Sequence, residues 1–461
     1  MKTFSINTLG CKVNQYESQQ IREFLESLGL HQSQTSDESD LFIINTCCVT
    51  HTATAKSRQQ IRKIQKQNPD SILIVCGCLP TLNSNNFSIN ENKVHFITNR
   101  NDLVTTLTQI ASKIAAVPGP HSTLSSPNST IKPEKGSKIK DKNLSNEHLF
   151  LPNLSSFEGQ TRAFLKVQDG CDGYCTYCIV PKTRPIVRSK PIQDVINEAA
   201  AFVQAGHKEI VITGIFLGAY GQNSVRRAKW SDKNNDYLPN LLERIAEIPH
   251  LNRIRLSSLE PSDVNDRVLD IFASYGNIMP HLHLSLQSGS DTILKKMCRQ
   301  YNSEQFREKI DLIKSRLDRP TLTTDIIVGF PGETDEDFED TVNLAKEVGF
   351  SKMHVFRFSP RQDTAAAKMD KRVKTEKVKG RSKILIDLDK ELRIKYQNQF
   401  LGQSAEVLIE NSNGIIQGRA ERYFMVNIEN PENSLKKNDL VKVKLVKNSD
   451  TAMTGQIISN S

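Results

Sequence analysis

Between Ala163 and Ser359 the chain repeats an apolar strand pattern six times, and this repeat limits its fold more than any other feature. The six segments are AFLKVQ (163–168), EIVITGI (209–215), RIRLSSL (253–259), HLHLSL (281–286), TLTTDIIVGF (321–330) and KMHVFRFS (352–359). A helical pattern follows each of the first five. Repeated βαβ units give parallel strands, so we expect an α/β fold that is a doubly wound sheet or a barrel.

A shorter run of the same kind precedes this repeat. Four segments have strand patterns: TFSINTLG (3–10), LFIINTC (41–47), SILIVCGC (71–78) and VHFIT (94–98). Three helical patterns separate or follow them, one of which places Ile21, Phe24, Leu25 and Leu28 on one face. Residues 1–115 are therefore expected to form a three-layer α/β domain. Residues 116–158 are rich in Pro, Ser, Asn and Lys and predict a flexible linker to a domain spanning 159–396.

The pattern changes again in residues 397–461, after an amphipathic helix bearing Ile384, Leu388 and Leu392. Five short strand patterns separated by turn residues predict a small antiparallel β-barrel. Barrels of this kind commonly bind nucleic acid, and one turn supplies basic and aromatic groups together, namely Arg419, Arg422, Tyr423 and Phe424. An ordinary folded surface is the alternative.

Composition and the N-terminal residues predict where in the cell the protein is located and the state of its cysteines. No stretch approaches about 18 apolar residues, and the N-terminus lacks a secretory apolar core, so we expect no membrane span and a cytoplasmic location. The nine cysteines are then expected to be metal ligands or redox groups rather than disulfides. The net charge is +9, and residues 351–400 contain 14 Lys and Arg against 6 Asp and Glu. This basic segment suits either a phosphate backbone or a solvated helix face.

Cys171, Cys175 and Cys178 form CxxxCxxC directly after a predicted strand. Three thiolates at this spacing can hold one corner of a cubane iron–sulfur cluster and leave one iron open, whereas zinc normally needs a fourth ligand. The open iron could chelate S-adenosylmethionine. A zinc site completed by a nearby histidine is the alternative.

A second cysteine set lies in the first domain. Cys11, Cys47 and Cys78 each follow a predicted parallel strand, and the carboxyl ends of such strands share one edge of a sheet. They could hold a second cluster, or they could be three unrelated buried thiols. Cys48 should face away from Cys47. Cys76, and Cys298 in a predicted helix, are more simply core thiols.

The CxxxCxxC loop, the aromatic Tyr177 within it and the six-strand alternation resemble the radical S-adenosylmethionine enzymes. This resemblance implies a partial (β/α)6 barrel that binds a [4Fe-4S] cluster and S-adenosylmethionine. It also implies contacts from Tyr177 near the adenosine, from Gly214 at the methionine end and from the IIVGFPGE segment at the adenine. The implied cofactor-binding residues are Tyr177, Gly214, Ile327, Gly329 and Glu333.

TLGCKVNQYES (8–18), NTCCVT (45–50) and CGC (76–78) are similar to the N-terminal domain of the methylthiotransferases, radical enzymes with two [4Fe-4S] clusters. The family motifs put the auxiliary-cluster ligands at Cys11, Cys47 and Cys78, with Cys48 and Cys76 as extra residues. The C-terminal barrel resembles the RNA-binding TRAM domain of the same family. The linker has no assignable role.

The family divides by substrate. The motifs most resemble the branch that converts N6-threonylcarbamoyladenosine at position 37 of tRNA, beside the anticodon, to its 2-methylthio derivative. Lys182, Pro185 and Phe358 depart from that branch. Isopentenyladenosine in tRNA and an aspartate of a ribosomal protein are alternative substrates, and a non-catalytic iron–sulfur RNA-binding protein is an alternative of another class.

The resemblance also implies a mechanism. One S-adenosylmethionine methylates a sulfur at the auxiliary cluster, and a second is cleaved at the Cys171, Cys175 and Cys178 cluster to activate the C2–H of the adenosine. We therefore expect both clusters to face one cavity between the first two domains. An electron donor, a sulfur source and the modified tRNA are the expected partners. No general base can be named.

Overall fold

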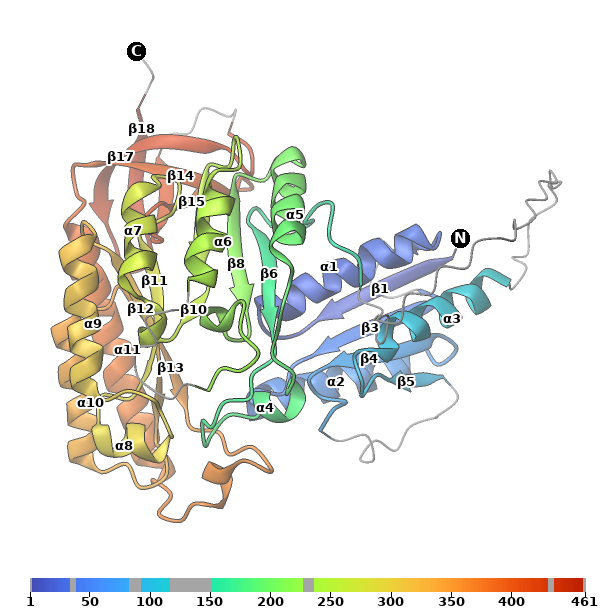
Figure 1. The fold of residues 1–461 in the computed structure, drawn as a ribbon, viewed down its shortest axis with the longest axis horizontal. Coiled ribbons are helices and arrows are strands. Elements are labelled where there is room, and N and C mark those ends of the chain that lie inside the picture. The colour runs from blue at the N-terminus through green and yellow to red at the C-terminus, as the bar shows by residue number, and fades with distance from the viewer. Residues whose placement is uncertain are drawn as a thin grey trace, which may run out of the picture. The chain divides into compact units, whose positions relative to one another are not determined.

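The computed structural model describes residues 2–33, 39–82, 93–116, 151–226, 236–429 and 435–458 (Figure 1). They form two compact units. The first contains Met1–Gly10, Glu17–Cys47 and Ala53–Asn153, and the second contains Cys11–Tyr16, Cys48–Thr52 and Leu154–Ser461. Most of the predicted linker, residues 117–150, lies outside the described residues.

The N-terminal sheet has five parallel strands in the order β2-β1-β3-β4-β5. The strands are β1 (Thr3–Thr8), β2 (His31–Gln32), β3 (Leu41–Thr46), β4 (Ile72–Gly77) and β5 (Val94–Phe96). The helices are α1 (Lys12–Ser27), α2 (His51–Gln67) and α3 (Asp102–Ala116). The predicted α/β pattern is confirmed. The sequence missed β2 because its two residues carry no apolar alternation.

Alternation along the strands explains how this sheet is covered. Ile43 and Ile74 pack in one cluster with Leu25 of α1 and Leu107 of α3. Their strand neighbours point to the opposite face because successive strand residues alternate. Ile61 of α2 is also fully buried.

The second unit contains the six predicted strands of the longer repeat in two four-stranded sheets (Figure 1). Within each sheet, neighbouring strands of the repeat pair in parallel. The third predicted strand (253–259) is divided at Ser257 into two pieces, one in each sheet. A short additional strand, β7 (Arg188–Ser189), runs antiparallel at the β6 edge. The strands are β6 (Ala163–Asp169), β8 (Glu209–Gly214), β9 (Arg253–Leu256), β10 (Ser258–Leu259), β11 (His281–Gln287), β12 (Thr321–Val328) and β13 (Lys352–Arg357).

Helical segments connect these strands. The longer helices are α5 (Ile192–Gln204), α6 (Tyr237–Ala246), α7 (Asp266–Ser274), α9 (Ser303–Arg316), α10 (Asp335–Val348) and α11 (Thr375–Asn398). The shorter ones are α4 (Val180–Thr183), η1 (Leu217–Ala219), η2 (Pro261–Asp263), α8 (Asp291–Lys296) and η3 (Ala365–Lys368). A repeated strand–helix order with parallel strands is the architecture that the sequence predicts for residues 159–396.

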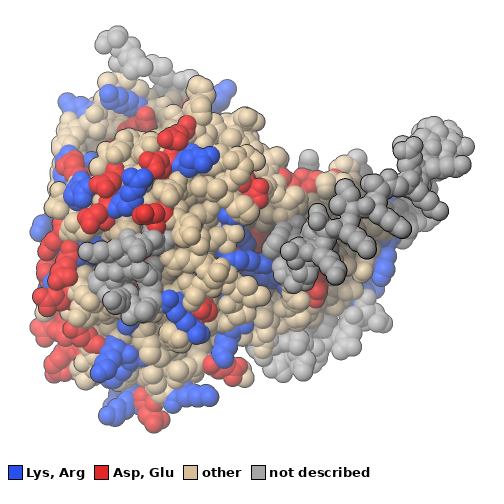
Figure 2. Space-filling model, in the orientation of Figure 1, with Lys and Arg blue, Asp and Glu red and all other residues tan. Residues whose placement is uncertain are grey.

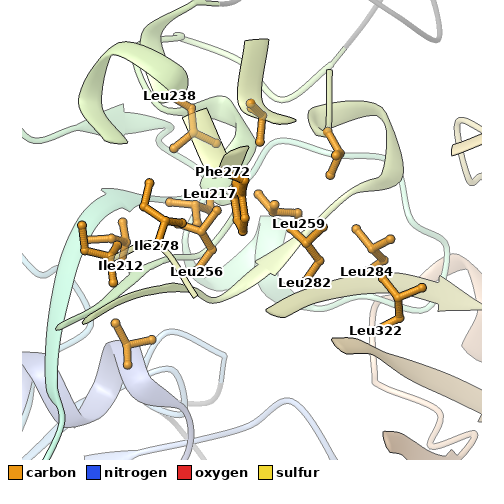
Figure 3. Packing of buried hydrophobic residues seen from close by; sticks show 14 of the residues in the cluster. Ile212, Leu217, Leu238, Leu256, Leu259, Phe272, Ile278, Leu282, Leu284 and Leu322 are labelled. Carbon is orange, nitrogen blue, oxygen red and sulfur yellow. The ribbon is translucent and has the colours of Figure 1, made fainter. Parts of the chain in front are cut away.

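One apolar core lies between the strands and the helices of this unit. Figure 3 shows Leu282 and Leu284 of β11 and Leu322 of β12 in the same cluster as Leu238 of α6 and Phe272 of α7. Fully burying each leucine contributes about 1.5–3 kcal/mol. This core holds the strand ends in fixed positions, which matters because the functional loops follow those ends.

The last part of the predicted linker joins this core. Leu154 and Phe157 are each only 2% exposed, and the Phe157 ring centroid lies 5.2 Å from that of Phe164. Residues from Leu154 onward therefore pack as part of the second unit.

The helix before the barrel differs from its expected orientation. Leu388 and Leu392 of α11 are buried as predicted, but Ile384 is 51% exposed. Leu385 is fully buried in its place. The buried stripe follows i, i+3 and i+7 spacing, while the prediction extended i+4 steps, which drift around a helix of 3.6 residues per turn.

The C-terminal segment forms the predicted small barrel, closed in the order β14-β15-β16-β18-β17. Its strands are β14 (Ser404–Asn411), β15 (Gln417–Ala420), β16 (Met425–Glu429), β17 (Leu440–Asn448) and β18 (Met453–Ile457). Four pairings are antiparallel, but β16 and β18 are parallel. A closed ring with an odd number of strands cannot alternate direction throughout, so one parallel pair is required.

Two buried arginines of β9 attach the barrel to the parallel sheet. Arg253 Nη2 donates to the backbone O of Glu406 at 2.6 Å. Arg255 Nη2 donates to the backbone O of Ala420 at 2.8 Å. Both guanidinium groups also pair with Glu209, whose Oε1 lies 2.8 Å from Arg255 Nε. Because buried charges must be paired and hydrogen-bonded, this network stabilises one position of the barrel on the sheet.

Tyr423 belongs to this junction and not to a free RNA-binding face. Its ring stacks on His281 of β11 with centroids 3.9 Å apart and an interplanar angle of 9°. Phe424 is buried in the barrel core. The RNA-stacking role predicted for these two aromatic residues is therefore wrong.

The two predicted RNA-binding arginines are also engaged within the protein. Arg419 Nε donates to Glu410 Oε1 at 3.2 Å, and Arg422 Nη2 donates to Asp318 Oδ2 at 3.1 Å. The sequence supplies the residue types but cannot tell which side of a small barrel is covered.

Among the helices of the described residues, none is long and apolar enough to cross a membrane. On the face shown in Figure 2, basic and acidic side chains are interspersed. Acidic side chains also accompany the basic segment 351–400, since Lys377 pairs with Asp335 and Lys383 pairs with Asp387.

Candidate functional site

The CxxxCxxC loop begins where β6 ends. Gly170 has a φ of 81°, a conformation that favours glycine, and it turns the chain out of the strand. Cys171 N then donates to the backbone O of Arg184 at 2.9 Å. Arg184 in turn pairs with Asp169 at 2.7 Å. These contacts hold the loop at the carboxyl end of β6, where parallel α/β sheets place their ligands.

The middle of the loop is attached to a distant segment of the second unit. Thr176 N donates to the backbone O of Met297 at 3.1 Å, and Thr176 Oγ1 donates to that of Lys296 at 2.8 Å. Ala366 N donates to the backbone O of Thr176 at 2.8 Å. The cysteines are therefore presented by a loop with several fixed points.

The three thiols fit an iron–sulfur cluster by their chemistry. Cys171, Cys175 and Cys178 are partly exposed, and no disulfide joins them. Gly173 N donates to Cys171 Sγ at 3.3 Å, a contact that stabilises the thiolate form. Burial raises the pKa of Cys171 to about 11 and that of Cys178 to about 12. A bound metal cation reverses this effect by stabilising the thiolates.

Arg299 is the main residue of this site that sequence reasoning missed. Its Nη1 lies 3.2 Å from Cys175 Sγ, and its Nη2 forms an ion pair with Glu260. Burial alone would lower the pKa of Arg299, but the Glu260 carboxylate raises it above its ordinary value. Arg299 follows α8, 124 residues after Cys175 in the sequence. Only the folded arrangement of strand ends brings the two together.

We expect Arg299→Gln to lower the midpoint potential of the cluster bound by this loop. Removing a positive hydrogen-bond donor from a ligand sulfur favours the oxidised cluster. The expected shift is on the order of 60 mV, which is a tenfold change for one electron. A redox titration followed by electron paramagnetic resonance measures it. As a control, Arg307→Gln removes an arginine paired with Glu347 and should leave the midpoint potential unchanged. If Arg299→Gln also has the potential of the parent enzyme, Arg299 does not tune the cluster.

The predicted cofactor residues Tyr177 and Ile327 are brought together. Both pack against a small apolar cluster that includes Met297 and Phe330. The Tyr177 hydroxyl lies 3.5 Å from Arg299 Nη1, and burial raises its pKa. Residues 150 positions apart in the sequence thus pack against the same apolar cluster.

Gly214 lies at the end of β8, in register with Gln168 of β6. A Cβ at Gly214 would lie 3.0 Å from that of Gln168, so a larger residue would crowd the strand end next to the cysteine loop. This position is consistent with close approach of a ligand to the backbone.

Gly329 and Glu333 form one turn after β12. Gly329 has a φ of 77°, and its N donates to Glu333 Oε2 at 2.8 Å. Glu333 also pairs with Arg381 at 2.5 Å, and burial raises its pKa. The carboxylate of Glu333 is thus engaged in holding the turn.

Cys47 and Cys78 lie at equivalent places in the N-terminal sheet. The register pairs Thr46 of β3 with Gly77 of β4, and one cysteine follows each. Cys78 N donates to the backbone O of Thr46 at 3.1 Å, and Arg100 Nη2 lies 4.0 Å from Cys78 Sγ. A cationic side chain near a thiol favours the thiolate that a cluster needs.

Cys11 directly precedes α1 in the part of the chain that belongs to the second unit. The following residues are tied to that unit: Asn14 Oδ1 accepts from Arg184 Nη2 at 3.2 Å, and the Tyr16 hydroxyl donates to Glu198 at 2.6 Å. Cys11 is exposed.

The three cysteines outside the two proposed ligand sets differ in burial. Cys48 is fully buried, and Cys76 lies in the core of the N-terminal sheet, as predicted. Cys298 is exposed and has a φ of 55°, so its interpretation as a helical core thiol is wrong. It follows the end of α8, where the chain turns to place Arg299.

Comparison with protein families gives two matches. The radical SAM superfamily matches residues 165–345, and the uncharacterized protein family UPF0004 matches residues 3–99. Among solved structures, a radical S-adenosylmethionine methyltransferase, TsrM from Kitasatospora setae, has a TM-score of 0.50 at 14% identity, covering 77% of this chain and 73% of that chain. This similarity concerns the fold alone.

Curated relatives match along nearly the whole chain. A threonylcarbamoyladenosine tRNA methylthiotransferase MtaB from Bacillus subtilis is 33% identical over 99% of this chain and 97% of its own length. The protein of the same name from Thermotoga maritima is 36% identical over 92% and 90%. A tRNA-2-methylthio-N(6)-dimethylallyladenosine synthase from Bacillus velezensis is 32% identical over 99% and 87%.

Proposed function

Because this chain belongs to the MtaB-like methylthiotransferases of the radical S-adenosylmethionine superfamily, we propose that it methylthiolates N6-threonylcarbamoyladenosine beside the anticodon of tRNA. Enzymatic modification of tRNA is the family's activity. The observation that carries the finer proposal is the similarity to MtaB relatives over almost the full length of both chains. The dimethylallyladenosine synthases have nearly equal identity but extend beyond this chain.

The enzyme uses S-adenosylmethionine and two [4Fe-4S] clusters. When bound, these groups supply a 5′-deoxyadenosyl radical for the unreactive C2–H of the adenosine and the methylthio group that replaces its hydrogen. We assign Cys171, Cys175 and Cys178 to the radical-generating cluster, and Cys11, Cys47 and Cys78 to the auxiliary cluster. Tyr177, Gly214, Ile327, Gly329 and Glu333 are proposed to form or support the S-adenosylmethionine site.

The side chains around the cysteine loop have distinct roles in this proposal. Arg299 provides fixed positive charge beside Cys175 and is held by Glu260. Tyr177 and Ile327 supply apolar surface that excludes water from the loop. Glu333 acts indirectly, by holding the turn that contains Gly329. No side chain is assigned as a general base.

The assignment of auxiliary-cluster ligands predicts a contrast between neighbouring cysteines. Cys47→Ser and Cys78→Ser should abolish methylthiolation, because each removes a proposed cluster ligand. Cys48→Ser and Cys76→Ala should change it little, since Cys48 is fully buried and Cys76 packs in the core of the N-terminal sheet. Mass spectrometry of nucleosides from treated tRNA measures the product. An active Cys47→Ser variant beside an inactive Cys48→Ser variant would contradict the assignment of Cys47 as a ligand.

Exposed lysines in the middle of the basic segment 351–400 provide a test of tRNA binding. Lys371, Lys374 and Lys379 are exposed. If they contact phosphates, replacing all three by alanine should weaken tRNA binding. The slope of the logarithm of the binding constant against the logarithm of the salt concentration should also become shallower by about one for each lost contact. Fluorescence anisotropy at several salt concentrations measures both quantities. Arg267→Ala, at an exposed pair with Glu243, is the control; unchanged binding in the triple variant would place the tRNA elsewhere.

A further inference from the structure

Three side chains with metal-binding atoms lie on consecutive strands of the second unit. They are His283 on β11, Asp325 on β12 and His354 on β13. His283 pairs with Thr323, which is two residues before Asp325 on β12, and Asp325 pairs with His354 on β13. The three residues therefore lie on neighbouring strands and are offset along them by no more than two residues. One possible ligand atom from each lies within 4.8 Å of the other two. His283 Nε2 and Asp325 Oδ1 are 3.4 Å apart.

These side chains share the face of the sheet that is turned away from the helical core. Leu282 and Leu284 flank His283 and point into that core, as Figure 3 shows. Ile326 and Met353, the neighbours of Asp325 and His354, are in the same core cluster. Because successive strand residues point to opposite faces, the three potential ligands lie together on the other face.

The two imidazoles are separated by a suitable distance for a shared ion. Their ring centroids are 5.8 Å apart with an interplanar angle of 42°. Two imidazoles bound to one zinc ion through bonds of about 2.1 Å have centroids roughly 5–6 Å apart.

A neighbouring hydroxyl already orients one of the rings. Thr323 Oγ1 lies 2.9 Å from His283 Nδ1, which leaves Nε2 directed at Asp325. Metal-binding histidines usually engage their second nitrogen in such a hydrogen bond. A simple histidine–aspartate pair would account for His283 and Asp325, but it does not require a second imidazole at this spacing.

We propose that His283, Asp325 and His354 bind a divalent transition-metal ion, at a site separate from the cysteine clusters. Two imidazoles and one carboxylate suit zinc or ferrous iron and leave coordination positions open. The site lies two residues along β11 from Ser285, whose backbone O accepts from Arg299 Nη2 at 3.4 Å. His283 and Ser285 share one face of β11 and two strand residues span about 7 Å, so the ion would lie on that face, one such step from the contact with Arg299.

Zinc is the probe that distinguishes this site from cluster iron. The cluster-loaded enzyme should bind about one zinc per chain in equilibrium dialysis, with iron content unchanged. X-ray absorption at the zinc edge should show imidazole ligands at about 2.0–2.1 Å and no sulfur at about 2.3 Å. Thr323→Val should weaken zinc binding about 10–100-fold, and His354→Ala should weaken it more. His250→Ala, at an exposed histidine, should bind as the parent does.

Two results would overturn the proposal. One is zinc affinity equal to the parent in both His354→Ala and Asp325→Asn, the latter preserving side-chain shape. The other is sulfur coordination of the bound zinc, which would assign it to cysteines. Iron content and circular dichroism of each variant show whether it has folded, so a loss of zinc in a folded, cluster-loaded variant supports the site.

Discussion

Replacing Cys171, Cys175 and Cys178 together by alanine is expected to lower bound iron from about eight to about four atoms per chain after anaerobic reconstitution. The variant should also form no 5′-deoxyadenosine, because the loop that binds and cleaves S-adenosylmethionine has lost its ligands. The effect on cleavage is complete, since no described residue of the loop can replace three thiolates. Iron analysis and chromatography of the reaction products measure the two outcomes.

The matched control removes a cysteine outside both triads. Cys298 is exposed, and Cys298→Ala should retain about eight irons and normal cleavage. Full iron loading in the triple variant would contradict the assignment of this loop. Loss of all iron would instead mean that the two proposed clusters do not bind independently.

Glu209→Gln is expected to destabilise the enzyme by about 3–5 kcal/mol at neutral pH, because it leaves buried arginines without their counter-charge. Glu209 is fully buried and pairs with Arg253 and Arg255 at the junction with the barrel. Urea unfolding followed by circular dichroism measures the change. Arg267→Ala, which breaks an exposed ion pair, should cost no more than about 1 kcal/mol.

The difference in free energy of unfolding between Glu209→Gln and the parent should depend on pH. Burial alone would raise the pKa of Glu209, but Arg255, Arg162 and Arg253 hold it below its ordinary value of 4.5. A lowered folded-state pKa contributes stability above the unfolded value, and this contribution is lost as the pH falls through the folded value. The two proteins should therefore approach each other in stability below about pH 4.5. A difference in stability that stays constant as the pH falls from about 5 to about 3 would show that the charge is not responsible.

This junction also changes how the role of the barrel must be tested. Deleting residues after Gln399 would strip Arg253 and Arg255 of their backbone acceptors on Glu406 and Ala420. Such a truncation would destabilise the remaining unit as well as remove the barrel. Surface substitutions such as those at Lys371, Lys374 and Lys379 separate RNA affinity from folding.

The sequence predicted the succession of strands and helices and the cysteine loop because both depend on local information. Strand alternation of two and helix periodicity of 3.6 are visible in short windows, and CxxxCxxC is contiguous. The missed or wrong predictions depend on long-range packing. Arg299 reaches Cys175 only after the parallel strands of the second unit align, and Tyr423 loses its exposure only when it stacks on His281. Ile384 and Leu385 are equally apolar, so only the position of the sheet decides which one is buried.

The most direct test of the proposed function uses purified enzyme with both clusters, S-adenosylmethionine, a reductant and two tRNA substrates. One tRNA carries N6-threonylcarbamoyladenosine and the other carries isopentenyladenosine at the same position. Mass spectrometry of the digested nucleosides should show 2-methylthio-N6-threonylcarbamoyladenosine in the first and unmodified isopentenyladenosine in the second. Methylthiolation of isopentenyladenosine alone, or of neither nucleoside while 5′-deoxyadenosine is formed, would contradict the proposed substrate.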